Sequence, residues 1–129
     1  MRQALPSRIV RSVTVALLAL AGLFALLSNA TGESRVAEVL GLDADLAHGE
    51  ALYMEISNPT CASCHSLSHG GAESNIASDL DELRPSARVT VQSLIGGTTP
   101  QHDREDYRHD LSNQDLADLA RYIEAVAGE

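Results

Sequence analysis

The sequence contains no lysine, so all nine of its basic residues are arginines, against 18 aspartates and glutamates. The first 30 residues hold three of these arginines and no acidic residue, so the net charge of −9 for the whole chain becomes −12 for residues 31–129. Nucleic acids and anionic membrane surfaces repel so acidic a chain. The composition therefore argues against nucleic acid as a partner and favours a protein with a basic docking surface. The alternative is that the acidity only maintains solubility.

Cysteine is scarce, because Cys61 and Cys64 are the only two. A structural zinc site usually takes its ligands from two cysteine pairs or from a cysteine pair and a histidine pair. No second cysteine pair exists here. A thioredoxin-like redox motif needs strands around it, and the flanking segments have the patterns of helix and loop. Both readings of the pair are disfavoured.

Long apolar runs are also missing, since the uncharged and mainly apolar run at residues 13–27 has only 15 residues. A helix that spans a bilayer needs about 20. The run follows three arginines and ends in Ser28-Asn29-Ala30, which is the pattern of a secretory signal. Residues 1–30 are thus predicted to be a signal peptide cleaved after Ala30, or alternatively an N-terminal membrane anchor. In either case the remainder of the chain is expected in the periplasm. It is expected to contact a membrane only if the N-terminal segment is retained.

The rest of the chain predicts an all-α fold, because it shows neither sustained alternation of apolar residues nor an Asn-Gly or Asp-Gly turn. Residues 31–42 are expected to form a flexible lead-in, and residues 43–129 one small domain. Apolar residues three and four positions apart predict a helix that starts at Asp43 or Asp45 and ends at Asn58-Pro59.

Two more helices have clear end signals. One begins near Pro85-Ser86 and ends at Gly96-Gly97, and the last follows a capping box of Ser112 and Asp115. Between them lies the polar, histidine-containing stretch 98–110, and a loop of that length in a small domain usually has a function.

The most informative stretch is Cys61-Ala62-Ser63-Cys64-His65. Cys-x-x-Cys-His is the attachment sequence of a covalently bound c-type haem. Two thiols at this spacing can each add to a vinyl group on one edge of a porphyrin, and the next residue brings an imidazole under the iron. One haem c is therefore predicted, with Cys61 and Cys64 binding the cofactor and His65 ligating the metal. The haem would also supply the apolar centre that a 99-residue domain lacks.

With these residues in view, the chain from about Leu46 to Val126 resembles the class I, monohaem cytochromes c. The resemblance implies three to four helices wrapped around one haem. It also implies that an N-terminal helix crosses a C-terminal one, and that small residues let the two backbones approach. The residues of that crossing would be Gly49 and Tyr53 against Leu119, Tyr122 and Ile123.

The run after the motif is similar to that of a cytochrome subgroup, and Leu80-Asp81-Glu82-Leu83 matches its end. Ile76-Ala77-Ser78-Asp79 stands where the subgroup has Val-Gly-Pro-Asn. In the family, a backbone carbonyl at this place commonly accepts a hydrogen bond from the proximal histidine.

A second departure concerns the sixth iron ligand, which the family usually takes from a methionine in the loop after its third helix. The only methionines here are Met1 and Met54. Alignment on Gly96-Gly97 places the methionine position at or next to Gln101-His102. His102 is therefore the predicted second metal ligand, and a bis-histidine iron is expected. The alternatives are an open site, His109 and, least favoured, Met54.

The other two histidines are expected to play no part in ligation. His69 lies four residues after His65, on the proximal side or at the surface, and His48 is expected to be exposed on the first helix.

These features predict a one-electron carrier that works between a dehydrogenase and a reductase or oxidase. Two alternatives remain: an open-site haem protein that binds or senses a small ligand, and the haem subunit of a larger oxidoreductase. The sequence shows no catalytic triad and no phosphate-binding glycine loop, so no independent enzyme activity is predicted.

Overall fold

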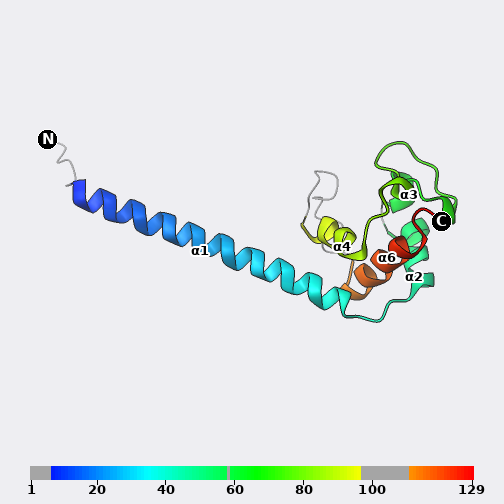
Figure 1. The fold of residues 1–129 in the computed structure, drawn as a ribbon, viewed down its shortest axis with the longest axis horizontal. Helices are drawn as coiled ribbons and strands as arrows, with labels where there is room; N and C mark the ends of the chain where they lie inside the picture. Colours follow the sequence, from blue (N-terminus) through cyan, green and yellow to red (C-terminus); the bar gives the residue numbers. More distant parts are fainter. Residues whose placement is uncertain (1–6, 58, 97–110) are drawn as a thin grey trace. The chain divides into compact units, whose positions relative to one another are not determined.

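The computed structural model describes residues 7–57, 59–96 and 111–129 (Figure 1). The chain divides into two compact units, Met1–Ser34 and Arg35–Glu129. Over the described residues, the regular elements are helices, and the strand-like pairing is limited to an isolated bridge between Leu67 and Ala72. The all-α prediction is confirmed.

The first unit consists, where it is described, of the greater part of helix α1 (Ser7–Leu40). Its large apolar side chains are exposed, from Val13 at 52% to Phe24 at 74%. Among the described residues, no helix has the length and apolar character needed to cross a membrane. The signal peptide over residues 1–30 stays a prediction.

The second unit begins with the last turns of α1, and here the expected flexible lead-in over residues 31–42 is corrected. Residues 35–40 are helical, and Val36 and Val39 are 3% and 0% exposed. Residues three apart share one face of a helix, so both valines reach the core together. The Arg35 Nε donates to the Asn113 side chain at 3.1 Å, which ties the segment to α6. The folded unit thus starts at Arg35 rather than at residue 43.

Helix α2 (Leu46–Ala51) starts where Asp45 accepts hydrogen bonds from the backbone N–H groups of Ala47 and His48, at 3.0 and 3.1 Å. Asp45 is therefore the N-cap, and it is one of the two residues, Asp43 and Asp45, predicted to start this helix. The helix continues as a wider π-helical turn, η1 (Leu52–Ile56). This change of helix type was not predicted, and such turns frequently occur at functional sites.

The remaining helices agree with their sequence signals. Helix α4 (Ala87–Gly96) follows Ser86, and helix α6 (Asn113–Val126) begins with the predicted capping box of Ser112 and Asp115. A short helix, α3 (Leu80–Leu83), is capped by Asp79. The confirmed signals have in common that they act over three or four residues of chain.

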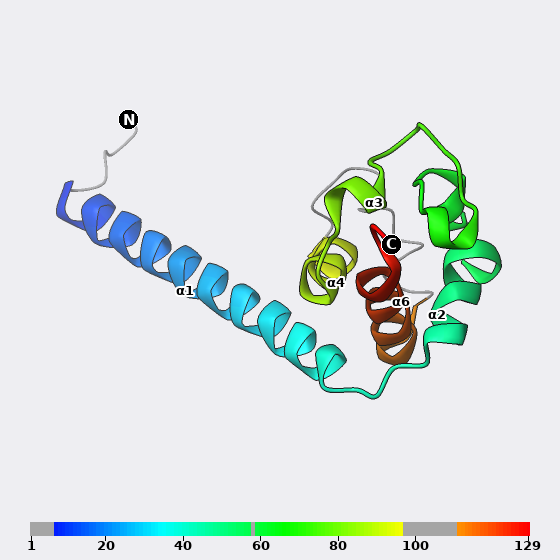
Figure 2. The same cartoon turned by 45° about the vertical axis from the view of Figure 1, so that its right-hand side comes forward.

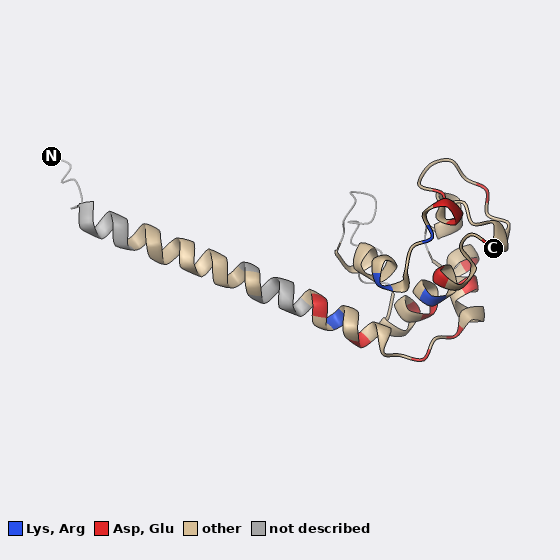
Figure 3. Ribbon diagram, in the orientation of Figure 1, with Lys and Arg blue, Asp and Glu red and all other residues tan. Residues whose placement is uncertain are grey.

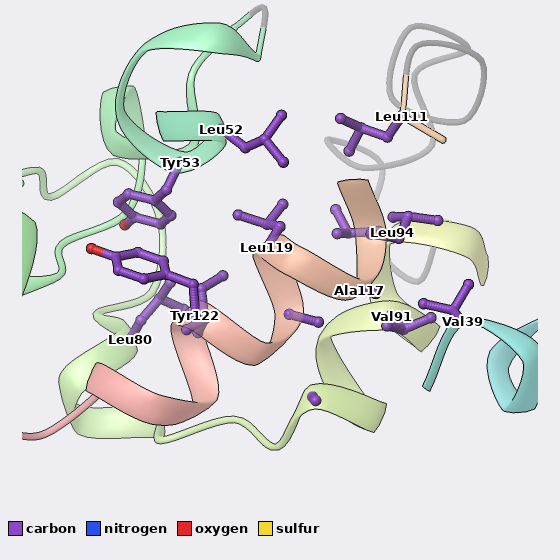
Figure 4. Packing of buried hydrophobic residues seen from close by; sticks show 14 of the residues in the cluster. Val39, Leu52, Tyr53, Leu80, Val91, Leu94, Leu111, Ala117, Leu119 and Tyr122 are labelled. Atoms are coloured by element: carbon purple, nitrogen blue, oxygen red, sulfur yellow. The ribbon is translucent and has the colours of Figure 1, made fainter. Parts of the chain in front are cut away.

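Helix α6 packs against both α2 and α4 (Figure 2). Where α2 and α6 cross, a Cβ atom added to Gly49 would lie 2.3 Å from the carbonyl oxygen of Asp118, so only glycine allows this approach. The Tyr53 and Tyr122 rings lie beside the crossing, 6.1 Å apart between centroids, and Leu119 continues the same layer (Figure 4). The helix pair implied by the family resemblance is confirmed.

Candidate functional site

The two cysteines lie on a tight turn directly after the first helix. A 3₁₀ turn, η2 (Cys61–Ser63), places the backbone N–H groups of Cys64 and His65 at 3.1 and 2.9 Å from the Cys61 carbonyl oxygen. Both cysteines are half-buried free thiols. Burial raises the pKa of the Cys61 thiol, and the nearby Ser57 hydroxyl partly offsets this effect. One hydrogen-bonded segment thus holds both thiols and the imidazole.

The orientation of His65 is set by a residue that lies far along the chain. Its Nδ1 atom is 2.7 Å from the backbone carbonyl oxygen of Ser78. A carbonyl can only accept, so Nδ1 carries a proton, and in the neutral imidazole the lone pair is then on Nε2. This is the tautomer that a metal-ligating histidine needs, and such a partner also raises the basicity of the ligand. Although Ser78 stands where the subgroup has proline, its carbonyl makes the hydrogen bond.

Tyr53 supports the same histidine from the π-helical turn. Its hydroxyl donates to the His65 carbonyl oxygen at 2.9 Å, and its side chain is completely buried. Burial raises the pKa of the Tyr53 hydroxyl well above its ordinary value, so this group remains a donor. Tyr53 was predicted only as a packing residue, and the sequence carries no local signal for this bond.

Asp81 on α3 connects the segment after the motif to the C-terminus of the chain. Its carboxylate accepts from the backbone N–H groups of Ser68, at 2.7 Å, and Gly128, at 2.9 Å. Hydrogen bonds from Gly128 and Ser68 lower the pKa of Asp81. This link anchors the chain that returns from His65 to the helical core.

Two of the other histidines are described, and each has a partner of its own. The imidazole of His69 lies edge-on to the Tyr122 ring, with centroids 6.2 Å apart, and 3.9 Å from the carboxylate of Glu129. The His48 side chain is 40% exposed on α2, and its Nδ1 atom lies 2.8 Å from the buried carboxylate of Asp118.

Of the three residues considered for the sixth ligand, the structure describes Met54. His102 and His109 lie outside the described residues. Met54 is part of η1 and packs, partly buried, against the hydrophobic core. The choice of distal ligand therefore remains a prediction from sequence.

The donor set of the motif fits a c-type haem. Two free thiols are available for thioether bonds. His65 is held by two hydrogen bonds, one from Tyr53 to its backbone carbonyl and one from its Nδ1 to the Ser78 carbonyl, which leaves Nε2 to face a metal. When one ring nitrogen of a histidine is held in a hydrogen bond, the other nitrogen is the one that can bind a metal. In His65 the bond from Nδ1 to the Ser78 carbonyl leaves Nε2 for the metal.

Comparison with known proteins agrees with this geometry. The family model described as Cytochrome c matches residues 46–127. Among solved structures, the c-type cytochrome SorU from Sinorhizobium meliloti is similar to the chain, with 31% sequence identity and a TM-score of 0.59 over 65% of this chain and 92% of SorU. No curated protein matches the chain. The chain belongs to the cytochrome c family, and is a haem electron carrier with covalently bound haem c.

Proposed function

We propose that this cytochrome is an exported, periplasmic one-electron carrier in which Cys61 and Cys64 attach the haem and His65 is the proximal iron ligand. The observation that carries the proposal is the 2.7 Å contact between His65 Nδ1 and the Ser78 carbonyl. It fixes the tautomer in which Nε2 can bind a metal. When bound, haem c supplies reversible one-electron chemistry at its iron, and the protein supplies position and electrostatics.

The residues around His65 have separate tasks in this proposal. The Ser78 carbonyl polarises the imidazole and makes it a stronger donor, which favours the oxidised iron and lowers the reduction potential. The Tyr53 hydroxyl holds the backbone of the histidine itself at 2.9 Å. Because Tyr53 is buried beside the crossing of α2 and α6, its hydrogen bond links the backbone of His65 to the buried core of the domain.

The sixth ligand is proposed to be His102, on the sequence argument that it takes the place of the usual methionine. Histidine in place of methionine lowers the potential of a cytochrome c. The carrier would then work with a low-potential donor.

The partners are proposed to be redox proteins with basic surfaces, a dehydrogenase on one side and a reductase or oxidase on the other. Acidic side chains occur on α2, α3 and α6 (Figure 3). Opposite charge on a partner speeds the diffusional encounter and makes its rate depend on salt. A rate that falls steeply as ionic strength rises is therefore expected with each physiological partner.

The test of attachment uses the exported holoprotein and the variant Cys64→Ser. Wild type should keep its haem stain on a denaturing gel, whereas the variant should lose stable covalent haem, because one of the two thioether bonds cannot form. An equally strong and stable stain in the variant would contradict the role of Cys64.

The test of the distal ligand compares His102→Ala with His109→Ala by absorption and electron paramagnetic resonance of the oxidised protein. The proposal expects a low-spin, bis-nitrogen signature in wild type and in His109→Ala, and its loss in His102→Ala. A high-spin wild type with rapid carbon monoxide binding would instead indicate an open site.

A further inference from the structure

The two neighbours of His65 in sequence both hold the loop that carries Ser78. The carbonyl of Cys64 accepts a hydrogen bond from the Ala77 N–H at 2.9 Å, and the carbonyl of Ser66 accepts from the Leu80 N–H at 3.1 Å. These bonds fall just before and just after Ser78. Cys64 and Ser66, which flank His65 in sequence, thus hold the backbone on both sides of the Ser78 carbonyl that orients His65.

The side chain of Ser66 adds a third attachment, further back in the loop. Its hydroxyl donates to the Ser74 carbonyl oxygen at 2.5 Å and lies 3.3 Å from the Ser74 N–H, from which it accepts. Both serines are half-buried. Ser74 in turn donates from its own hydroxyl to the Ser63 carbonyl, at 3.2 Å. We call this pair of bonds between Ser66 and Ser74 the serine clamp.

A physical reason for such a clamp lies in the residue at position 78. Proline fixes its own φ angle, whereas serine leaves that angle free, and fixing the backbone of a residue costs conformational entropy. The direction of the Ser78 carbonyl is therefore determined by the bonds on either side. Ser66 is the residue that contributes to this frame with its side chain as well as its backbone.

We propose that Ser66 is a positioning residue for the haem iron, which holds the Ser78 carbonyl on His65 Nδ1 through Ser74 and thereby keeps the reduction potential low. The inference rests on the proposed function, in that His65 must be the proximal ligand. Without the clamp, the loop gains freedom, the bond to Nδ1 weakens, and the imidazole becomes a poorer donor to oxidised iron.

The first experiment is a redox titration of the holoprotein and of Ser66→Ala. At a fixed ambient potential, the ratio of reduced to oxidised protein should rise in the variant by up to about tenfold, which corresponds to about 59 mV for a one-electron couple. Ser66→Thr keeps the hydroxyl and should restore most of the wild-type value.

The matched control is Ser86→Ala. The Ser86 hydroxyl also accepts a hydrogen bond from backbone, from the Val89 N–H at the start of α4, and among the described residues no hydrogen bond joins this hydroxyl to the loop that carries Ser78. Its removal should change stability and leave the potential as in wild type. A shift in Ser86→Ala equal to that in Ser66→Ala would mean that the potential follows general stability, and would overturn the inference.

A second measurement on the wild-type holoprotein covers the case in which Ser66→Ala does not mature. Hydrogen exchange followed by magnetic resonance should show protected N–H groups at Ser74, Ala77 and Leu80, and a slowly exchanging Nδ1–H on His65. Rapid exchange at Ser74 would show that the clamp does not form, and would overturn the inference.

The outcomes also separate this inference from the function on which it rests. If magnetic resonance assigns the proximal ligand to a residue other than His65, the proposed function fails with it. If His65 is the ligand and the titration curves of wild type and Ser66→Ala coincide, only the role of Ser66 is refuted.

Discussion

The imidazole Nδ1 of His48 lies 2.8 Å from a carboxylate oxygen of Asp118, a side chain that is 1% exposed. The other oxygen of Asp118 accepts from the Asp45 N–H at 2.9 Å and from the Gln114 side chain at 2.8 Å. Asp45 caps α2, and Gln114 and Asp118 belong to α6. One buried carboxylate thus joins the start of one helix to the face of another, and its three donors satisfy the charge.

The first prediction concerns the pH dependence of stability. The hydrogen bond to Asp118, together with the charges of Asp115, Asp118 and Asp45, raises the pKa of His48. Burial by itself would raise the pKa of Asp118, but the hydrogen bonds from His48, Asp45 and Gln114 outweigh it and the pKa is lowered. The histidine contribution is therefore complete below its unfolded pKa of about 6.5 and is lost as pH rises through the folded value.

The carboxylate contribution has the opposite sign. It is present above the unfolded pKa of about 3.9 and is lost as pH falls through the lower folded value. The pair should stabilise the holoprotein most between about pH 4 and 6.5. Thermal unfolding should give a melting temperature that declines from pH 6 towards pH 9, with a smaller decline in His48→Gln.

The control for this pH series is His69→Gln, since His69 is exposed and lies 3.9 Å from its carboxylate partner Glu129. Its pH profile should follow that of wild type. Parallel profiles for wild type and His48→Gln would refute the role given to His48.

The second prediction concerns Gly49. A Cβ atom there would lie 2.3 Å from the Asp118 carbonyl oxygen and 2.7 Å from Tyr122 Cβ. Gly49→Ala must separate α2 from α6, and we expect a loss of about 1–3 kcal/mol in the free energy of unfolding, the usual cost of overpacking. Chemical denaturation measures it. In Gly32→Ala, where nothing lies within 4 Å, no such loss is expected, and an equal loss there would remove the argument from close approach.

The third prediction compares the two buried tyrosine hydroxyls. Tyr53→Phe leaves the His65 carbonyl without its donor and should cost about 1 kcal/mol of unfolding free energy. The Tyr122 hydroxyl is buried and has no hydrogen-bond partner among the described residues. Tyr122→Phe should therefore be neutral or slightly stabilising. The denaturant midpoint should therefore be lower for Tyr53→Phe than for Tyr122→Phe. A lower midpoint for Tyr122→Phe would contradict the hydrogen bond assigned to Tyr53.

The fourth prediction concerns Asp81, whose pKa is lowered by hydrogen bonds from Gly128 and Ser68. The stability that it provides is present above its unfolded pKa of about 3.9 and is lost as pH falls through the lower folded value. Asp81→Asn should flatten this acid limb and speed amide exchange at Ser68 and Gly128. Asp79→Asn serves as the comparison, because Asn also caps helices well. Unchanged exchange in Asp81→Asn would show that the carboxylate does not anchor the C-terminus.

The sequence by itself determined the features that act over a few residues. The Cys-x-x-Cys-His motif indicated the cofactor, Asp45 and the Ser112–Asp115 box marked the helix starts, and the spacing of apolar residues marked α2, α4 and α6. Each of these is decided by hydrogen bonds or periodicity within one or two helical turns. This is why the fold class and the cofactor could be predicted without a structure.

Only the tertiary structure decided which distant residues meet. Val36 and Val39 lie in a segment that is polar in composition, and their burial follows from the core cluster that the folded chain builds around them. Asp118 was missed because its partner His48 is 70 positions away. The contact between His65 and Ser78 spans 13 positions, and only the structure shows that it forms with serine in the place of the family's proline. Backbone carbonyls are the same in every residue, so their partners follow from the path of the chain and not from side-chain identity.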